Sequence, residues 1–76
     1  MPVEIDVGVY GVTTAGKTVN LSNKGMLANV DQPIEVGERC MIRFSEPGPN
    51  HDAVMSGTVV RVHRVGDGNL VALEFD

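Results

Sequence analysis

The sequence predicts an all-β fold, a small six-stranded antiparallel β-barrel. Apolar residues recur at every second position along most of the chain, which is the period of a half-buried strand, and no segment has a helical period. Turn-forming residues separate about six short apolar runs. Because closure removes the exposed edges that so many strands would otherwise carry, we expect a barrel or closed sandwich.

The first half of the chain contains three expected strands. Val3, Ile5, Val7 and Val9 alternate with polar or small residues and predict the first of them. Residues 11–16, which begin and end with glycine, are expected to form a turn. Short strands are then expected at 17–21 and 26–30, with a loop over 20–25 between them, before Asp31-Gln32-Pro33 breaks the chain.

The second half contains the other three strands. A turn at 35–38 leads into a strand over 39–44, in which Cys40, Ile42 and Phe44 share the buried face. Residues 46–50 contain two prolines, which fix φ and remove donors, so they cannot form regular structure. Residues 54–65 are rich in β-branched side chains and predict a long strand. Gly66-Asp67-Gly68-Asn69 predicts a hairpin turn into the last strand, 70–75.

Length and composition indicate a single domain over residues 1–76. Hydrophobic residues make up 42% of the chain and charged residues 21%, which is ordinary for a globular protein. Cys40 is the only cysteine, so no internal disulfide can form. No signal-peptide pattern is visible, and no apolar run approaches the roughly 20 residues of a membrane span. We therefore expect a soluble, cytoplasmic protein that does not insert into a membrane.

The charge argues against a nucleic-acid polymer as partner. The net charge is −4, and the six Lys and Arg residues are scattered along the chain. Because binding of DNA or RNA rests on many cations that neutralise a run of phosphates, we expect neither as a partner. A small ligand with one or two phosphates needs only a local positive patch and remains compatible with this charge.

The segment Asn20-Leu21-Ser22-Asn23-Lys24-Gly25 places two short polar side chains and a glycine between two strand-like runs. An amide offers donors and an acceptor, and a hydroxyl can do both, so this loop could hold a ligand. The same residue types also cap and close ordinary turns that bind nothing. The six residues by themselves favour the ordinary turn.

The context of this loop resembles the PilZ domain family. Thr18 to Leu27 is similar to the (Asp/Asn)-x-Ser-x-x-Gly signature that joins two strands of the PilZ barrel, with Asn20, Ser22 and Gly25 at the signature positions. The later segments at 36–44 and 57–62 and the ending Val71-Ala72-Leu73-Glu74-Phe75 also resemble PilZ strands. The resemblance covers nearly the whole chain and implies a PilZ-like barrel of six strands.

The resemblance implies a bacterial signalling module rather than an enzyme. PilZ domains are receptors for the second messenger cyclic di-GMP, so Asn20 and Ser22 are expected to hydrogen-bond that ligand, with Gly25 keeping the loop open for it. Cyclic di-GMP would be a signalling ligand, and no cofactor is expected. The signal would pass to a partner protein or to a neighbouring domain.

The chain departs from the family in one motif. PilZ receptors carry Arg-x-x-x-Arg just before the first strand, and those guanidinium groups clamp phosphates and stack on guanine. This sequence has no arginine before Arg39. Two readings follow: a receptor whose binding by these 76 residues is weak, or a degenerate PilZ adaptor that docks a protein and does not bind cyclic di-GMP.

The remaining polar residues point to no catalytic or metal site. No nucleophile, base and acid share a motif, and His51 and His63 have no cysteine or carboxylate at ligand spacing. Arg61, His63 and Arg64 form a small basic cluster that either lines the ligand face or is simply solvated, and Lys24 is open to the same two readings. Met26, Met41 and Met55 are expected to fill the core.

Overall fold

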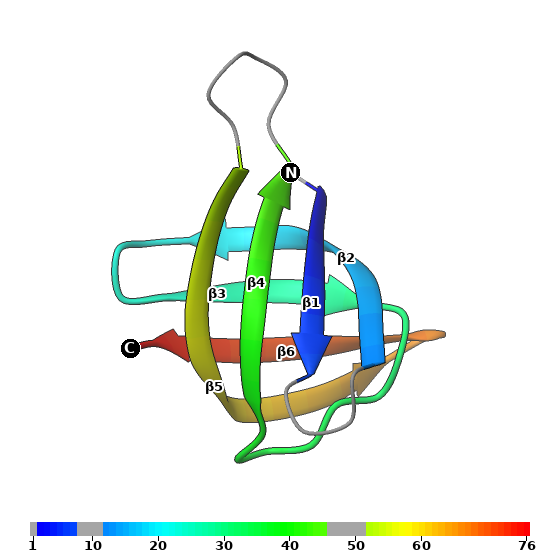
Figure 1. Cartoon of the computed structure of the whole chain (residues 1–76). Coiled ribbons are helices and arrows are strands. Elements are labelled where there is room, and N and C mark those ends of the chain that lie inside the picture. Colours follow the sequence, from blue (N-terminus) through cyan, green and yellow to red (C-terminus); the bar gives the residue numbers. More distant parts are fainter. Residues whose placement is uncertain (1, 8–11, 46–51) are drawn as a thin grey trace.

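Six strands and no helix make up the part of the chain that the computed structural model describes, residues 2–7, 12–45 and 52–76. The strands are β1 (Pro2–Val7), β2 (Val12–Leu21), β3 (Gly25–Val30), β4 (Arg39–Ser45), β5 (Asp52–Val65) and β6 (Gly68–Phe75). Neighbours pair antiparallel in the order β1-β2-β3-β6-β5-β4, and β1 also pairs with β4 to close the barrel (Figure 1). The predicted fold class is confirmed.

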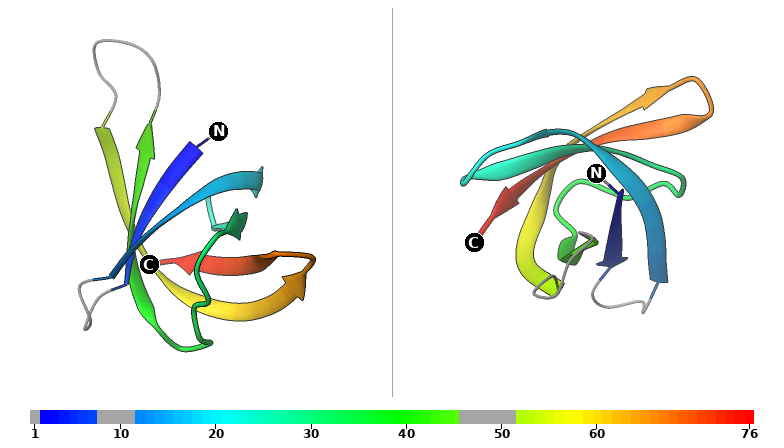
Figure 2. Two further views of the ribbon diagram at one scale, coloured as in Figure 1. Left: turned by 90° about the vertical axis from the view of Figure 1, so that its right-hand side faces the viewer. Right: turned by 90° about the horizontal axis from the view of Figure 1, so that it is seen from above.

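Two long strands take part in both layers of the barrel. In Figure 1, β1, β4 and the first half of β5 stand vertically, while β3, β6 and the second half of β2 lie horizontally behind them. The views in Figure 2 show the same two layers from the side and from above, with β2 and β5 bending from one layer into the other. Chain pairing agrees, because Gly16 of β2 lies opposite both Val3 of β1 and Val30 of β3.

The core consists of the inward side chains that the period of two predicted. In β1 the buried residues are Val3, Ile5 and Val7, and in β4 they are Cys40, Ile42 and Phe44. The other buried apolar residues are Met26, Ala28, Val30, Ile34, Val59, Val71 and Leu73. Burial of this apolar surface stabilises the barrel, at about 25 cal/mol per Å² removed from water.

Two of the three methionines expected in the core are not there. Met26 is buried, but Met41 is 46% exposed and Met55 is 37% exposed. Met41 stands between the buried Cys40 and Ile42 and therefore points outward, as alternation requires. Met55 lies opposite Ile42 but belongs to the half of β5 that pairs only with β4, so its side chain stays partly open.

The prediction of a turn over residues 11–16 was wrong for residues 12–16, the part that the structure describes. Residues 12–16 already belong to β2 and pair with β1, with Ile5 opposite Thr14 and Glu4 opposite Ala15. Gly16 was misleading because it serves a close approach within a strand: a Cβ atom there would lie 2.7 Å from the backbone oxygen of Asn29. Thr14 is buried, and its Oγ1 accepts a hydrogen bond of 3.1 Å from the backbone nitrogen of Gln32.

The other strands match their predictions within two residues at each end. β5 begins at Asp52 and β6 begins at Gly68, so the hairpin turn is the two-residue Gly66–Asp67, in which Gly66 has a φ of 59°. Val9, the proline-rich segment at 46–50 and His51 lie outside the described residues. Within the described ranges no helix is long and apolar enough to cross a membrane.

A candidate ligand-binding surface

A β-bulge puts Asn20 on the outside of the barrel. Thr18 pairs with Ala28 and Asn20 pairs with Leu27, so Val19 is an extra residue in β2. An extra residue reverses the inside–outside alternation that follows it. Without the extra residue Val19, the Asn20 side chain would point inward like those of Thr14 and Thr18. With it, Asn20 is exposed on the outer surface. Among the described residues no hydrogen bond uses the Asn20 amide.

The Ser22 hydroxyl is engaged within its own turn. Its Oγ accepts a hydrogen bond of 3.3 Å from the backbone nitrogen of Lys24 and donates one of 3.4 Å to the carbonyl of Gly25. The Ser22 backbone nitrogen also donates to the Gly25 carbonyl, at 3.0 Å. These contacts are the turn chemistry that the sequence left open, and the serine remains exposed beside Asn20 at the end of the β2–β3 hairpin.

Gly25 has a packing task of its own. Its φ is not positive, and it stands opposite Glu74 at the start of β3. A Cβ atom at this position would collide with the backbone oxygen of Leu73 in β6. The glycine therefore permits the close β3–β6 pairing that holds residues 20–25, which we call the Asn20 loop, against the barrel. A 2.9 Å hydrogen bond from the backbone nitrogen of Phe75 to the carbonyl of Lys24 reinforces this contact.

A second bulge places Arg61 on the same outer surface. Val59 pairs with Leu73 and Arg61 pairs with Ala72, so Val60 is the extra residue in β5. Arg61 and His63 are consequently exposed, while Val62 packs against the core. The registers align one residue from each of four strands in an outward row, which we call the Asn20–Arg61 row: Asn20, Leu27, Ala72 and Arg61.

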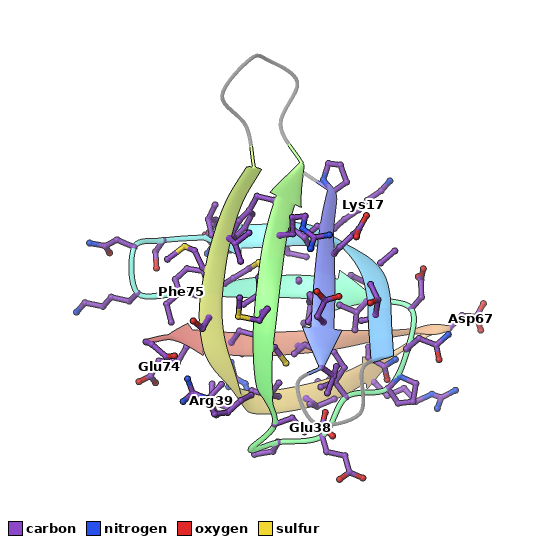
Figure 3. All side chains as sticks on the ribbon, in the orientation of Figure 1. Lys17, Glu38, Arg39, Asp67, Glu74 and Phe75 are labelled. Atoms are coloured by element: carbon purple, nitrogen blue, oxygen red, sulfur yellow. The ribbon has the colours of Figure 1, made fainter. Side chains whose placement is uncertain are left out.

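We call the outer surface of β3, β6 and the second halves of β2 and β5 the β3–β6 face, and two hollows lie on it. One, of about 230 Å³, is lined by Leu27, Arg61, His63, Leu70 and Ala72. The other, of about 710 Å³, lies nearer the β5–β6 hairpin and includes Lys17, Val19, Asp31, Val65 and Asp67 among its lining residues. Figure 3 shows Asp67 at the right-hand edge, where that hairpin ends, and Lys17 near the upper end of β1, where it pairs with Pro2.

The cations of the chain divide between two surroundings. Arg43 lies 3.4 Å from a carboxylate oxygen of Glu4 and 3.9 Å from one of Asp6, and Arg39 forms an ion pair with Asp76. Lys17, Lys24, Arg61 and Arg64 have no ion pair with any residue that the structure describes. The basic cluster predicted at residues 61–64 is exposed, and two of its members, Arg61 and His63, line the smaller hollow.

The sequence identified the loop and the cluster but not their alignment. Leu27 and Ala72 were not singled out, because each reads as an ordinary strand residue. A sequence signal was present for one of the two bulges: Val59 and Val60 are adjacent apolar residues, which breaks the alternation of apolar and polar residues, whereas residues 18–21 alternate without a break. Such a break marks where a strand re-aims its side chains, yet it does not tell which strands become neighbours.

The described strands form a closed six-stranded antiparallel barrel with an exposed polar loop between β2 and β3. The sequence model of the PilZ domain family matches residues 1–76, the whole chain. The chain therefore belongs to the PilZ family, a family of cyclic di-GMP receptors whose members are binding modules rather than enzymes. No curated protein matches the chain.

Proposed function

We propose that this domain binds cyclic di-GMP on its β3–β6 face, through the Asn20 amide and the Ser22 hydroxyl, and relays binding to a partner protein or neighbouring domain. The observation that carries the proposal is the β2 bulge, which turns Asn20 from the core side to the solvent side at a position that resembles the first residue of the PilZ signature. An outward, uncommitted amide on a strand end costs little ordering entropy when it binds a ligand.

The chemistry of the loop fits one edge of a guanine or a phosphate. The Asn20 amide has two donors and an acceptor, and the Ser22 hydroxyl can exchange its weak 3.4 Å contact with the Gly25 carbonyl for a bond to a ligand. Lys24 lies in the same turn, and its positive charge attracts phosphate. We expect binding by these 76 residues alone to be weak, because they carry no Arg-x-x-x-Arg ahead of β1.

A degenerate adaptor is the second candidate, and the same face favours it in one respect. Val19 is 61% exposed and Val65 is 51% exposed, and both line the larger hollow. Exposed apolar side chains gathered in one place are typical of a surface that docks a protein. In this reading the face contacts a partner directly and cyclic di-GMP is not needed.

The test is a titration of the chain with cyclic di-GMP, followed by amide chemical shifts up to millimolar ligand because binding is expected to be weak. The double variant Asn20→Ala/Ser22→Ala should keep the spectrum of a folded barrel. Each lost hydrogen bond is worth on the order of 1 kcal/mol, so the affinity should fall about thirtyfold.

The matched control is Thr13→Ala/Gln32→Ala, which also removes one hydroxyl and one amide but outside the Asn20 loop. It should bind as the unchanged chain does. Equal affinity of the Asn20→Ala/Ser22→Ala variant, or no shift change in the unchanged chain at millimolar ligand, would reject the receptor and leave the adaptor.

A further inference from the structure

We infer that Arg61 is a second anchor for the same ligand, binding a phosphate at the far end of the Asn20–Arg61 row. This inference rests on the proposed function and adds a residue outside the signature loop. In this inference Arg61 contacts the phosphate. The apolar side chains of Leu27 and Ala72 form the surface between the two anchors, Asn20 and Arg61. The loop and the arginine would then hold opposite ends of one molecule.

The first support is the register. Two independent bulges, one at Val19 and one at Val60, bring Asn20 and Arg61 to the outer surface, and both then fall in one row across four strands. Removal of either bulge would turn one of the two polar residues toward the core. β-Bulges commonly serve to re-aim a side chain beside a functional site.

The second support is the shape of the surface at Arg61. The hollow of about 230 Å³ has an apolar floor of Leu27, Leu70 and Ala72, with Arg61 and His63 at its rim. Leu27, Leu70 and Ala72 are half-buried, so they present apolar surface without protruding side chains. A flat purine base can lie on such a floor, while a planar guanidinium at the rim offers a two-pronged hydrogen bond to phosphate oxygens.

The third support is charge. Arg61 has no ion pair with a described residue, in contrast to Arg39 and Arg43, so its guanidinium is free to bind an anion. Glu74, opposite Thr58, lies two residues after Ala72 along β6, and it makes no ion pair with Arg61 in the described ranges. The larger hollow is less suitable for a phosphate, because Asp31 and Asp67 border it beside Lys17.

The spacing defines the ligand class. Asn20 and Arg61 stand on strands three steps apart, which places their backbones about 14 Å from each other at the usual strand separation of about 4.8 Å. One base with one phosphate reaches from either anchor to the middle of the row. A cyclic dinucleotide carries two bases and two phosphates and can contact both ends at once.

The experiment is the cyclic di-GMP titration repeated with Arg61→Ala, Arg61→Lys and Arg64→Ala. Arg64 is a matched control, because it is an exposed arginine three residues along the same strand, opposite Asn69 and outside the row. We expect Arg61→Ala to weaken binding about tenfold to a hundredfold, which is the usual worth of a hydrogen bond to a charged group. Arg61→Lys should recover part of the loss, since it keeps the charge but not the planar fork. Arg64→Ala should bind as the unchanged chain.

The outcomes separate the inference from the proposed function. If Arg61→Ala binds normally while Asn20→Ala/Ser22→Ala loses affinity, the receptor stands and the second anchor is wrong. If Arg64→Ala weakens binding as much as Arg61→Ala, the effect is general charge attraction and the assignment of Arg61 fails. If the unchanged chain shows no shift changes at millimolar ligand, both proposals fail together.

A mononucleotide adds a check on the span. GMP should bind at least tenfold more weakly than cyclic di-GMP, because it reaches only one anchor. Its shift changes should cluster at one end of the row rather than at both Asn20 and Arg61. Equal affinity for GMP and cyclic di-GMP would contradict an anchor at each end.

Discussion

The two outer faces of the barrel treat their polar side chains differently. On the β1–β4 face, which we define as the outer surface of β1, β4 and the first halves of β2 and β5, the polar groups satisfy one another. Arg43 approaches both Glu4 and Asp6, and Thr13 Oγ1 donates a 2.6 Å hydrogen bond to Asp6 Oδ1. On the β3–β6 face, Asn20 and Arg61 have no such partners among the described residues.

This difference between the faces indicates that an anionic ligand would bind more favourably to the β3–β6 face. An ion pair on a surface must be broken and desolvated before an anion can use its cation, whereas an unpaired arginine offers its donors at once. Both bulges lie where β2 and β5 pass from the first face to the second. The same irregularities that bend the strands therefore also supply the outward polar residues of the β3–β6 face.

The largest expected effect comes from adding cations to the β3–β6 face. Pro2 lines the larger hollow beside Lys17, so residues placed before it begin at the margin of this face. An N-terminal extension that carries Arg-x-x-x-Arg should tighten cyclic di-GMP binding by about two to four decades, because two charge-assisted contacts are worth roughly 1.5–3 kcal/mol each. Calorimetric titration of both chains measures the gain.

The matched control is an extension of equal length with Ala-x-x-x-Ala, which should leave the affinity of the 76-residue chain unchanged. An arginine extension that adds nothing would favour the adaptor over the receptor. Sub-micromolar binding by the 76 residues without any extension would show that the arginines matter less than we expect.

The next effect breaks the β3–β6 pairing itself. Gly25→Ala should destabilise the fold by about 1–3 kcal/mol, because the new methyl group collides with the backbone oxygen of Leu73 and β3 must shift against β6. Urea unfolding measures the loss, and amide shifts should change along β3 and β6 more than along β1 and β4. Asn23→Ala, in the same turn but exposed, is the control and should be nearly neutral. Unaltered stability of Gly25→Ala would mean that the close approach can relax freely.

The fold was largely predictable because each strand is specified by the pattern of apolar residues within its own short segment. The period of two and the β-branched run at 54–65 predicted six strands, although the first half of β2 was expected to be a turn. The inward positions of β1 and β4 were correct as far as the structure describes them. Gly16 was misread because the sequence does not show that another backbone will approach it. Met55 was misplaced because its burial depends on whether a second strand covers that half of β5.

The candidate site was predictable only in part. Asn20, Ser22 and Gly25 could be singled out as candidates because they are close in sequence and resemble a family signature. Arg61 lies forty-one positions after Asn20 by subtraction, and the two meet in one row only through the order β2-β3-β6-β5 and two bulges. Such an alignment is a property of register, which the residues of one strand do not determine by themselves.

A smaller effect tests the β1–β4 face. Arg43→Ala removes the contacts with Glu4 and Asp6, but these side chains are 40–50% exposed, so the loss of stability should be only about 0.2–1 kcal/mol. The loss should shrink in 1 M salt, where exposed charges are screened. Affinity for cyclic di-GMP should not change, in contrast to Arg61→Ala. A fall in affinity for Arg43→Ala would mean that the ligand also uses the β1–β4 face.

The smallest expected effect on stability at neutral pH comes from ionisation of the Cys40 thiol, on the inner side of β4. Burial, and next the charge of Glu38, raise the pKa of the Cys40 thiol above its ordinary value of about 9.0, and the thiol faces the Glu38 carbonyl at 3.9 Å. A raised pKa in the folded state means that the unfolded chain loses this proton first. The thiol's contribution to stability is therefore complete below about pH 9 and is lost as the pH rises through the folded pKa. Urea unfolding between pH 7 and pH 10.5 should show a steeper decline for the unchanged chain than for Cys40→Ala, whose overall stability is lower but whose curve lacks this titration. Parallel curves for the two chains would show that Cys40 titrates alike in the folded and unfolded states, and that the inner side of β4 is wetter than its 3% exposure indicates.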